Sequence, residues 1–192
     1  EGMQFFNHYS GSTVCAPTRS CLMTGQHTGR TRIRGNSKAF LKPEDITVAE
    51  VLKKAGYATG CVGKWGLGEA GSPGIPNKQG FDFFFGYLNQ SRAHRFYPDY
   101  IWRNEEKELY PDNPTKRKTY IHDSFTTEGL NWIEKQSTTD EPFFLYMAYT
   151  LSHVDLDGPG DSMEPYLKTI KEKSPYKNPN SPQKGYRSHP TP

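Results

Sequence analysis

The chain has 192 residues and a formal net charge of +3, and its composition is 33% hydrophobic and 14% aromatic. Such a composition can form the core of one domain and excludes the disordered class. Lys and Arg are scattered, without the basic stripe of a nucleic-acid binder, and no apolar run approaches the roughly 18 residues of a membrane span. The three cysteines form neither a disulfide framework nor a Cys-x-x-Cys metal site.

The N-terminal part predicts a strand, a loop and a helix. Residues 3–9 favour a short strand, and a small, polar loop follows. Pro17 suits the first position of a helix, and Gly25 suits its end. Cys15 therefore lies where a loop leads into a helix N-terminus.

The next segments alternate between a helix and extended structure. Residues 47–55 form the clearest helix, because a Thr-x-x-Glu capping box starts it and a glycine ends it. Residues 57–63 predict a strand. The Gly- and Pro-rich stretch 66–80 indicates a loop, and the aromatic run 81–87 indicates a short packed element.

The C-terminal half repeats the pattern. Residues 124–136 predict a helix with one apolar face, and residues 143–149 are a continuous apolar run typical of a parallel strand buried on both faces. The side chains expected on that helical face are Phe125, Leu130 and Ile133. Helices that precede strands in this order predict an α/β fold with a mostly parallel sheet. Residues 174–192 are loop-rich and without periodicity.

The segment from Cys15 to Gly25, Cys-Ala-Pro-Thr-Arg-Ser-Cys-Leu-Met-Thr-Gly, resembles the sulfatase signature Cys-x-Pro-Ser/Thr-Arg with its later Thr-Gly. In that family the cysteine is oxidised to formylglycine, so the resemblance implies an aldehyde at Cys15. One hydroxyl of the hydrated aldehyde attacks sulfur and releases the alcohol, and the other expels sulfate. The resemblance also implies that Arg19 holds the nucleophile and its charge, which helix N–H groups would favour.

A second segment, Gly-Tyr-Ala-Thr-Gly-Cys-Val-Gly-Lys-Trp at residues 56–65, resembles another sulfatase signature, which normally ends Gly-Lys-Trp-His-Leu-Gly. By that resemblance Lys64 contacts the substrate sulfate and the nucleophile. Here Gly66 stands in place of the family histidine. Either a nearby histidine substitutes for it, with His94 as the candidate, or this subfamily works without it.

A third segment, residues 142–153, resembles the sulfatase strand that is followed by a turn ending in histidine. The resemblance makes His153 a ligand of the substrate sulfate and a candidate general acid, because the pKa of histidine lies near working pH. Outside these motifs, Cys21 and Cys61 are expected in the core. The pair His122-Asp123 could mimic a catalytic dyad, but the start of a helix is the favoured interpretation.

The resemblance implies a partial alkaline-phosphatase-like α/β/α sandwich, with residues 1–192 forming part of a sulfatase catalytic domain truncated at both ends. It also implies one divalent cation, usually Ca²⁺, bound in the family by acidic and amide side chains upstream and downstream. From this chain only the oxygen derived from Cys15 would join that metal site, so the fragment alone is expected to be inactive. The implied partners are a formylglycine-generating enzyme and a sulfated small molecule or glycan, and the implied location is periplasmic or extracellular.

Three functions therefore remain open. The first is hydrolysis of sulfate esters, of the arylsulfatase kind and on a sulfated carbohydrate. The second is hydrolysis of phosphodiesters or phosphonate monoesters, since that superfamily shares the modified nucleophile. The third is a catalytically degenerate domain that binds sulfated glycans, which Gly66 would favour.

Overall fold

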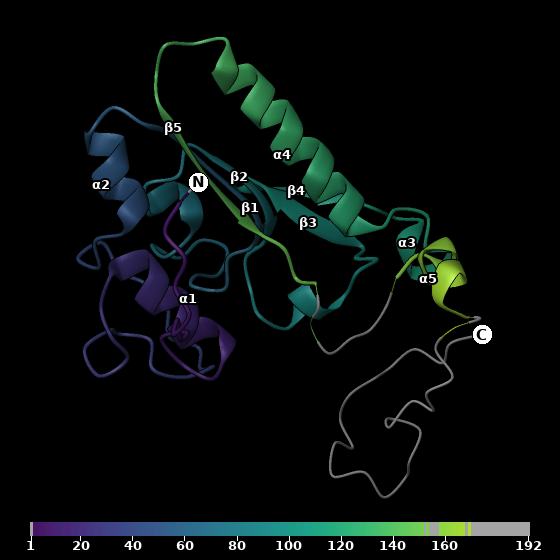
Figure 1. Cartoon of the computed structure of the whole chain (residues 1–192), viewed down its shortest axis with the longest axis horizontal. Coiled ribbons are helices and arrows are strands. Elements are labelled where there is room, and N and C mark those ends of the chain that lie inside the picture. The colour runs from purple at the N-terminus through teal and green to yellow at the C-terminus, as the bar shows by residue number, and fades with distance from the viewer. Residues whose placement is uncertain (1, 152, 154–157, 168, 170–192) are drawn as a thin grey trace, which may run out of the picture.

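A five-stranded sheet in the order β4-β3-β2-β1-β5 forms the centre of the computed structural model (Figure 1), which describes residues 2–151, 153, 158–167 and 169. β1 pairs in parallel with both β2 and β5, whereas β3 and β4 add an antiparallel hairpin beside β2. The strands are β1 (Ala58–Lys64), β2 (Phe83–Tyr87), β3 (Tyr100–Arg103), β4 (Glu106–Leu109) and β5 (Phe143–Ala148). The predicted α/β fold with a mostly parallel central sheet is confirmed.

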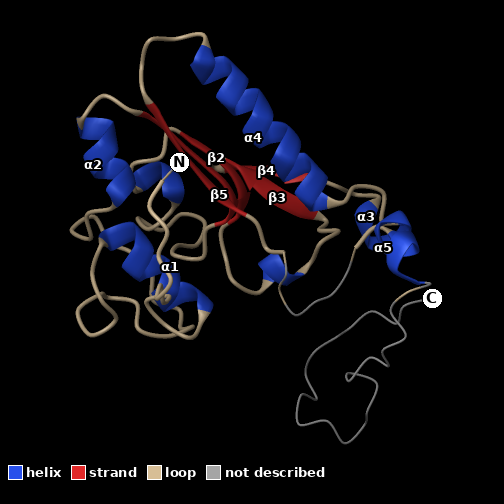
Figure 2. Cartoon of the chain, in the orientation of Figure 1, coloured by secondary structure: helices blue, strands red, loops and turns tan. Residues whose placement is uncertain are grey.

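Helices cover both faces of this sheet (Figure 2). The long helix α4 lies along one face, and α1 and α2 lie on the other side, so the layers are α/β/α. The helices are α1 (Cys15–Thr24), α2 (Val48–Lys54), α3 (Asn113–Lys116), α4 (Ile121–Ser137) and α5 (Gly160–Leu167), with 3₁₀ turns η1 (Pro76–Lys78) and η2 (Arg92–His94). The predicted capping box of α2 is present, and Gly25 ends α1 in the left-handed conformation.

Alternation along β1 and β2 sends successive side chains to opposite layers. Cys61 and Phe84 join the core beneath α1 and α2, whereas Val62 and Phe85 join the core beneath α4. The strands also approach closely: a Cβ atom on Gly63 would lie 2.2 Å from the carbonyl oxygen of Ala148 on β5. Glycine at this position therefore permits the close approach of β1 and β5 beside the site.

Several predicted elements differ from the structure. Residues 3–9 form no strand, because they have no hydrogen-bonded neighbour strand in the described part of the chain and their side chains are exposed. Helix α1 starts at Cys15, two residues before Pro17; proline is tolerated there because N–H groups of a first turn have no intrahelical acceptor. The hairpin β3–β4 was not predicted.

Two predicted faces are also wrong. β5 is an edge strand among the described residues, and most of it is only half-buried rather than buried on both faces. Helix α4 buries Phe125 as predicted but exposes Leu130 and Ile133, because Trp132 takes the position facing the sheet. The loop-rich segment predicted over 174–192 lies outside the described residues.

Candidate active site

The carboxyl ends of the three parallel strands β1, β2 and β5 meet at one edge of the sheet, which is where α/β folds place their ligands. A pocket of about 450 Å³ opens there, beside the first turn of α1. We call it the Cys15 pocket. Its lining residues are Ser10, Ser12, Thr13, Val14, Cys15, Thr18, Arg19, Leu22, Lys64, Tyr146, Tyr149, Thr150, Leu151 and His153.

Cys15 is the first residue of α1 and is half-buried in the pocket wall. The helix dipole places partial positive charge at this end. However, the Ala16 N–H already donates to Asn36 Oδ1 at 3.0 Å, and Pro17 has no N–H. The expected helix N–H donors are thus largely used or missing, and an anion at Cys15 must rely on nearby side-chain cations.

Lys64 supplies one of these cations. It ends β1, its side chain is only 1% exposed, and its Nζ makes no hydrogen bond to any described residue. Burial lowers the pKa of Lys64, attraction to Cys15 opposes that shift, and repulsion from Arg19 adds to it. Because burial disfavours the charged form of Lys64, an anion bound beside Nζ would stabilise the ammonium.

Arg19 lies one helical turn after Cys15 and supplies the second cation. Its Nη1 donates to the backbone carbonyl of Lys64 and, at 3.3 Å, to the hydroxyl of Tyr146 on β5. These bonds fix the guanidinium between α1 and the ends of two strands. Neither Arg19 nor Lys64 has a carboxylate within ion-pair distance among the described residues, so the pocket carries uncompensated positive charge.

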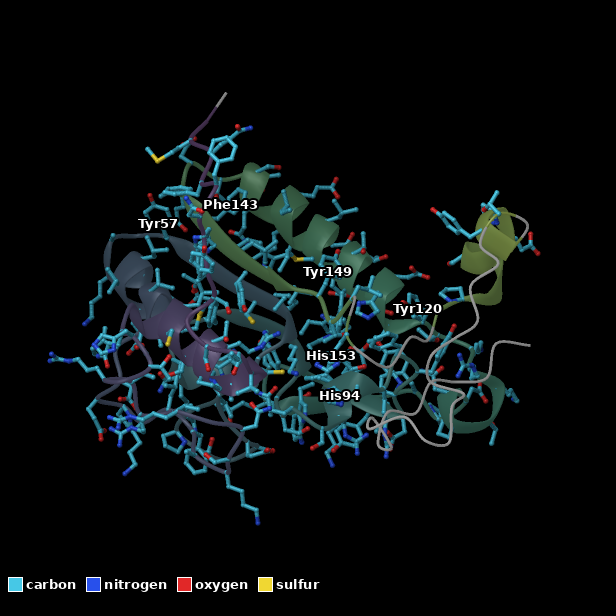
Figure 3. The ribbon with its side chains drawn as sticks, turned by 60° about the horizontal axis from the view of Figure 1, so that its bottom comes forward. Tyr57, His94, Tyr120, Phe143, Tyr149 and His153 are labelled. Atoms are coloured by element: carbon cyan, nitrogen blue, oxygen red, sulfur yellow. The ribbon has the colours of Figure 1, made fainter. Side chains whose placement is uncertain are left out.

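His153 follows β5 and comes close to the cysteine. The distance from its Nε2 to Cys15 Sγ is 3.8 Å, and its backbone N–H donates to the Thr150 carbonyl at 2.9 Å. The ring of His94 stacks on that of His153, with 4.3 Å between centroids and 29° between planes. Figure 3 shows the two imidazoles close together, beyond Tyr149, the residue that directly follows β5.

Gly66 adopts a left-handed backbone conformation, with φ of 78°. A Cβ there would lie 2.2 Å from Gln90 Nε2, which donates to the Gly66 carbonyl at 2.8 Å. The Gln90 side chain therefore occupies the space that a side chain at position 66 would need.

The sequence matches the sulfatase family model over residues 1–188. The chain belongs to the sulfatase family. It is 32% identical to an arylsulfatase of Hemicentrotus pulcherrimus in an alignment of 184 positions that covers 81% of this chain and 32% of that protein. It is 33% identical to the N-acetylgalactosamine-6-sulfatase of Sus scrofa in an alignment of 175 positions that covers 80% of this chain and 33% of that protein. The chain thus spans about a third of the length of these curated relatives.

Solved structures agree on the fold. The chain is similar to Ps i-CgsB crystallised with k-i-k-neocarrahexaose, with a TM-score of 0.71 and 24% identity over 85% of this chain and 40% of that one. It is also similar to a protein crystallised with its substrate D-glucosamine-2-N,6-O-disulfate, with a TM-score of 0.69 and 22% identity over 88% of this chain and 31% of that one. At these identities the likeness supports the alkaline-phosphatase-like sulfatase fold.

The structure brings four sequence-predicted residues of this sulfatase chain to one pocket: Cys15, Arg19, Lys64 and His153. The fifth, His94, is not among the lining residues of the pocket but stacks on His153, which is. Cys61 is fully buried as expected, and burial raises the pKa of its thiol, which keeps that thiol unreactive. Cys21 was expected in the core but is only half-buried, with Sγ 3.5 Å from Thr28 Oγ1.

Two pocket-lining residues and one helix-capping residue were missed from the sequence. Tyr146 and Thr150 lie in or just after an apolar strand that looked like pure core, yet the end of β5 forms a pocket wall. Asn36 lies in a loop with no motif and still caps the helix that carries Cys15. The only available signal was that polar residues at the carboxyl end of a parallel strand tend to line sites.

The described residues do not by themselves complete the calcium site that the sulfatase family implies. Among them, no three His, Cys, Asp or Glu side chains gather closely enough to hold a metal ion. Separately, none of the described helices has both the length and the apolar character that a bilayer crossing requires.

Proposed function

We propose that this chain supplies the nucleophile-bearing part of an active site that hydrolyses sulfate esters. The observation that carries the proposal is the buried Lys64 amine, which lies beside Cys15 and has no oxygen or nitrogen acceptor among the described residues. A sulfate group bound at Cys15 would give Nζ its missing acceptor and would neutralise an unpaired buried charge. We propose accordingly that residues 1–192 form part of a sulfatase catalytic domain.

The proposed nucleophile is formylglycine made from Cys15 by a formylglycine-generating enzyme. Cys15 fits this role because it is half-buried at a helix N-terminus and lines an open pocket, unlike the fully buried Cys61. When hydrated, the aldehyde supplies one hydroxyl that attacks sulfur and a second whose loss of a proton releases sulfate and restores the carbonyl.

The other residues have separate proposed roles. Lys64 and Arg19 hold the sulfate oxygens and stabilise the negative charge that grows in the transition state. His153, within 3.8 Å of the nucleophile position, binds the sulfate and gives a proton to the leaving alcohol oxygen. His94, stacked on His153, also contacts the substrate. It takes the role of the family histidine, in whose place Gly66 stands here.

The proposed substrate is a sulfated carbohydrate or another sulfated small molecule. Two observations support this class: a relative is named N-acetylgalactosamine-6-sulfatase, and a structural neighbour was crystallised with k-i-k-neocarrahexaose. Such substrates are met outside the cytoplasm, so we propose a periplasmic or extracellular location. One Ca²⁺ ion is part of the proposal, with its remaining ligands supplied from outside this chain. For that reason the isolated 192-residue chain should show no turnover, and measurable turnover would contradict this part.

The test compares turnover of an aryl sulfate and an aryl phosphodiester by the full-length protein, produced together with a formylglycine-generating enzyme. We expect the sulfate ester to be preferred, and Cys15→Ala to abolish its hydrolysis. Cys21→Ala, a substitution on the same helix, should retain it. Preference for the phosphodiester would support the second function considered above. Retained binding of sulfated glycans without any turnover would support the degenerate domain.

A further inference from the structure

A third histidine lies deep beside the site without touching the nucleophile. His122 is in the first turn of α4 and is only 3% exposed. Aromatic rings enclose it, with centroid distances of 4.9 to 6.0 Å. These rings belong to Phe96, Tyr120, Phe125 and Tyr149. A phenylalanine would pack there without the desolvation cost of an imidazole, so the ring nitrogens need a reason.

The hydrogen bonds of His122 lead to the active site. Its Nε2 lies 3.1 Å from Thr150 Oγ1, a buried contact between α4 and the residue two positions beyond the end of β5. The carbonyl of the same Thr150 accepts the backbone N–H of His153 at 2.9 Å. Two successive hydrogen bonds thus connect the rigid helix to the turn that brings His153 within 3.8 Å of Cys15.

The surroundings of His122 favour its neutral form, which holds Thr150 through one hydrogen bond. Burial lowers the pKa of His122 to about 4, and the first turn of a helix disfavours a cation further. Nδ1 is buried and has no hydrogen-bond partner among the described residues. An orphaned acceptor is tolerated better than an orphaned N–H, so the hydrogen-bond network assigns the proton to Nε2, which donates to Thr150.

We propose that His122 is a positioning residue that clamps the Thr150–His153 turn and thereby sets the distance between His153 and the nucleophile. The kinetic part of this inference rests on the proposed sulfate-ester hydrolysis, but the clamp itself does not. Loss of the clamp leaves Cys15, Arg19 and Lys64 in place. It should therefore slow proton transfer from His153 more than it weakens substrate binding, because Lys64 and Arg19 still hold the sulfate.

The chain offers a matched control on the same helix. Thr126, one turn after His122, bonds through Oγ1 to the hydroxyl of Tyr149 at 2.8 Å, on the exposed side of the neighbouring residue. Both bonds join α4 to the segment after β5, but only the one from His122 reaches Thr150. Thr126 Oγ1 also donates to the His122 carbonyl at 2.9 Å. Thr126→Val thus removes the bond to Tyr149 and this backbone contact while leaving the bond between His122 Nε2 and Thr150 in place.

The test uses His122→Phe and Thr150→Val in the full-length protein, with Thr150→Ser and Thr126→Val as controls. Hydrogen exchange of the peptide 149–153 is measured first, since it needs no activity. We expect the first two variants to exchange at least about tenfold faster, and both controls to match the parent, because native-state exchange reports local opening. Unchanged exchange in His122→Phe, or equal acceleration in Thr126→Val, would overturn the clamp.

Kinetics then test the consequence. With an aryl sulfate, we expect about a tenfold lower kcat and a KM within twofold for His122→Phe. The double variant with Thr150→Val should be no slower than either single variant, because the two side chains form one connection. Additive losses would refute the shared role. If the parent shows no turnover, the proposed function fails while the exchange result still decides the clamp.

Discussion

Two basic side chains in this chain, Arg103 and Lys64, have opposite surroundings. Arg103 on β3 donates to Glu108 at 2.8 Å and makes a two-pronged pair with Glu128 on α4 at 2.9 Å. Its pKa is raised, chiefly by the hydrogen bonds to Glu128. Lys64, in contrast, is more deeply buried, meets no carboxylate among the described residues, and has a lowered pKa.

The two cations differ in whether the fold itself supplies a negatively charged partner, and this difference indicates a structural or a functional role. A cation whose partners are all within the fold connects elements, as Arg103 connects the β3–β4 hairpin to α4. A buried cation without a partner costs stability and persists where a ligand supplies the missing charge. His122 shows a third outcome, in which burial removes the charge and leaves a neutral hydrogen-bonding group.

The largest expected effect comes from removing the unpaired charge. Lys64→Met should lower kcat/KM for an aryl sulfate about 10³-fold, since a preorganised contact to the transition state is lost. The same change should leave the free energy of unfolding equal or higher, because an uncompensated buried charge disappears. Steady-state kinetics and urea unfolding of the full-length protein measure both quantities. A large loss of stability would show that Lys64 is structural.

The neutral histidine predicts a dependence of stability on pH. The pKa of His122 in the folded state is about 4, below the value of 6.5 expected when unfolded, so unfolding takes up a proton between these values. Stability from this residue is full above pH 6.5 and falls by up to about 3 kcal/mol as the pH drops to 4. His122→Phe should lack this component. Identical stability profiles of the two proteins between pH 7 and 4 would contradict the prediction.

The paired cation predicts the reverse of the Lys64 result. Arg103→Met should lower the free energy of unfolding by about 1–2 kcal/mol, because a half-exposed network with two carboxylates is lost. Turnover per folded molecule should stay within about threefold, since no Arg103 atom lines the Cys15 pocket. Chemical unfolding measures the loss of stability, and active-site titration gives the turnover per folded molecule. A loss of turnover without a loss of stability would show that Arg103 has a functional role, like Lys64.

The smallest effect concerns the backbone beside Lys64. Gly66→Ala should cost about 1 kcal/mol, because φ of 78° disfavours a Cβ and Gln90 lies in its way. Adding Gln90→Ala should restore the stability that is lost through the clash, but not the stability that is lost through the left-handed backbone. Thermal unfolding of the three variants measures this. A stabilising Gly66→Ala would show that the turn relaxes freely.

The sequence predicted the parts of the fold and site that depend on local chemistry. The capping box of α2, the left-handed Gly25 and the strand before Lys64 follow from short-range rules, and the signature around Cys15 identified the pocket residues. The missed features depend on contacts between distant segments. His122 and Thr150 are 28 positions apart, and Trp132 replaces Leu130 at the sheet only because of where β1 and β5 lie. Pattern alone cannot reveal such pairings.

The central claim is that Cys15 becomes the aldehyde nucleophile served by Lys64 and Arg19. Peptide mass spectrometry across Cys15 tests it most directly, on full-length protein made together with a formylglycine-generating enzyme and beside a control sulfatase. The account predicts a peptide whose thiol is replaced by an aldehyde, with Cys21 in the same peptide unchanged. An unmodified Cys15, in cells where the control sulfatase is modified, would contradict it.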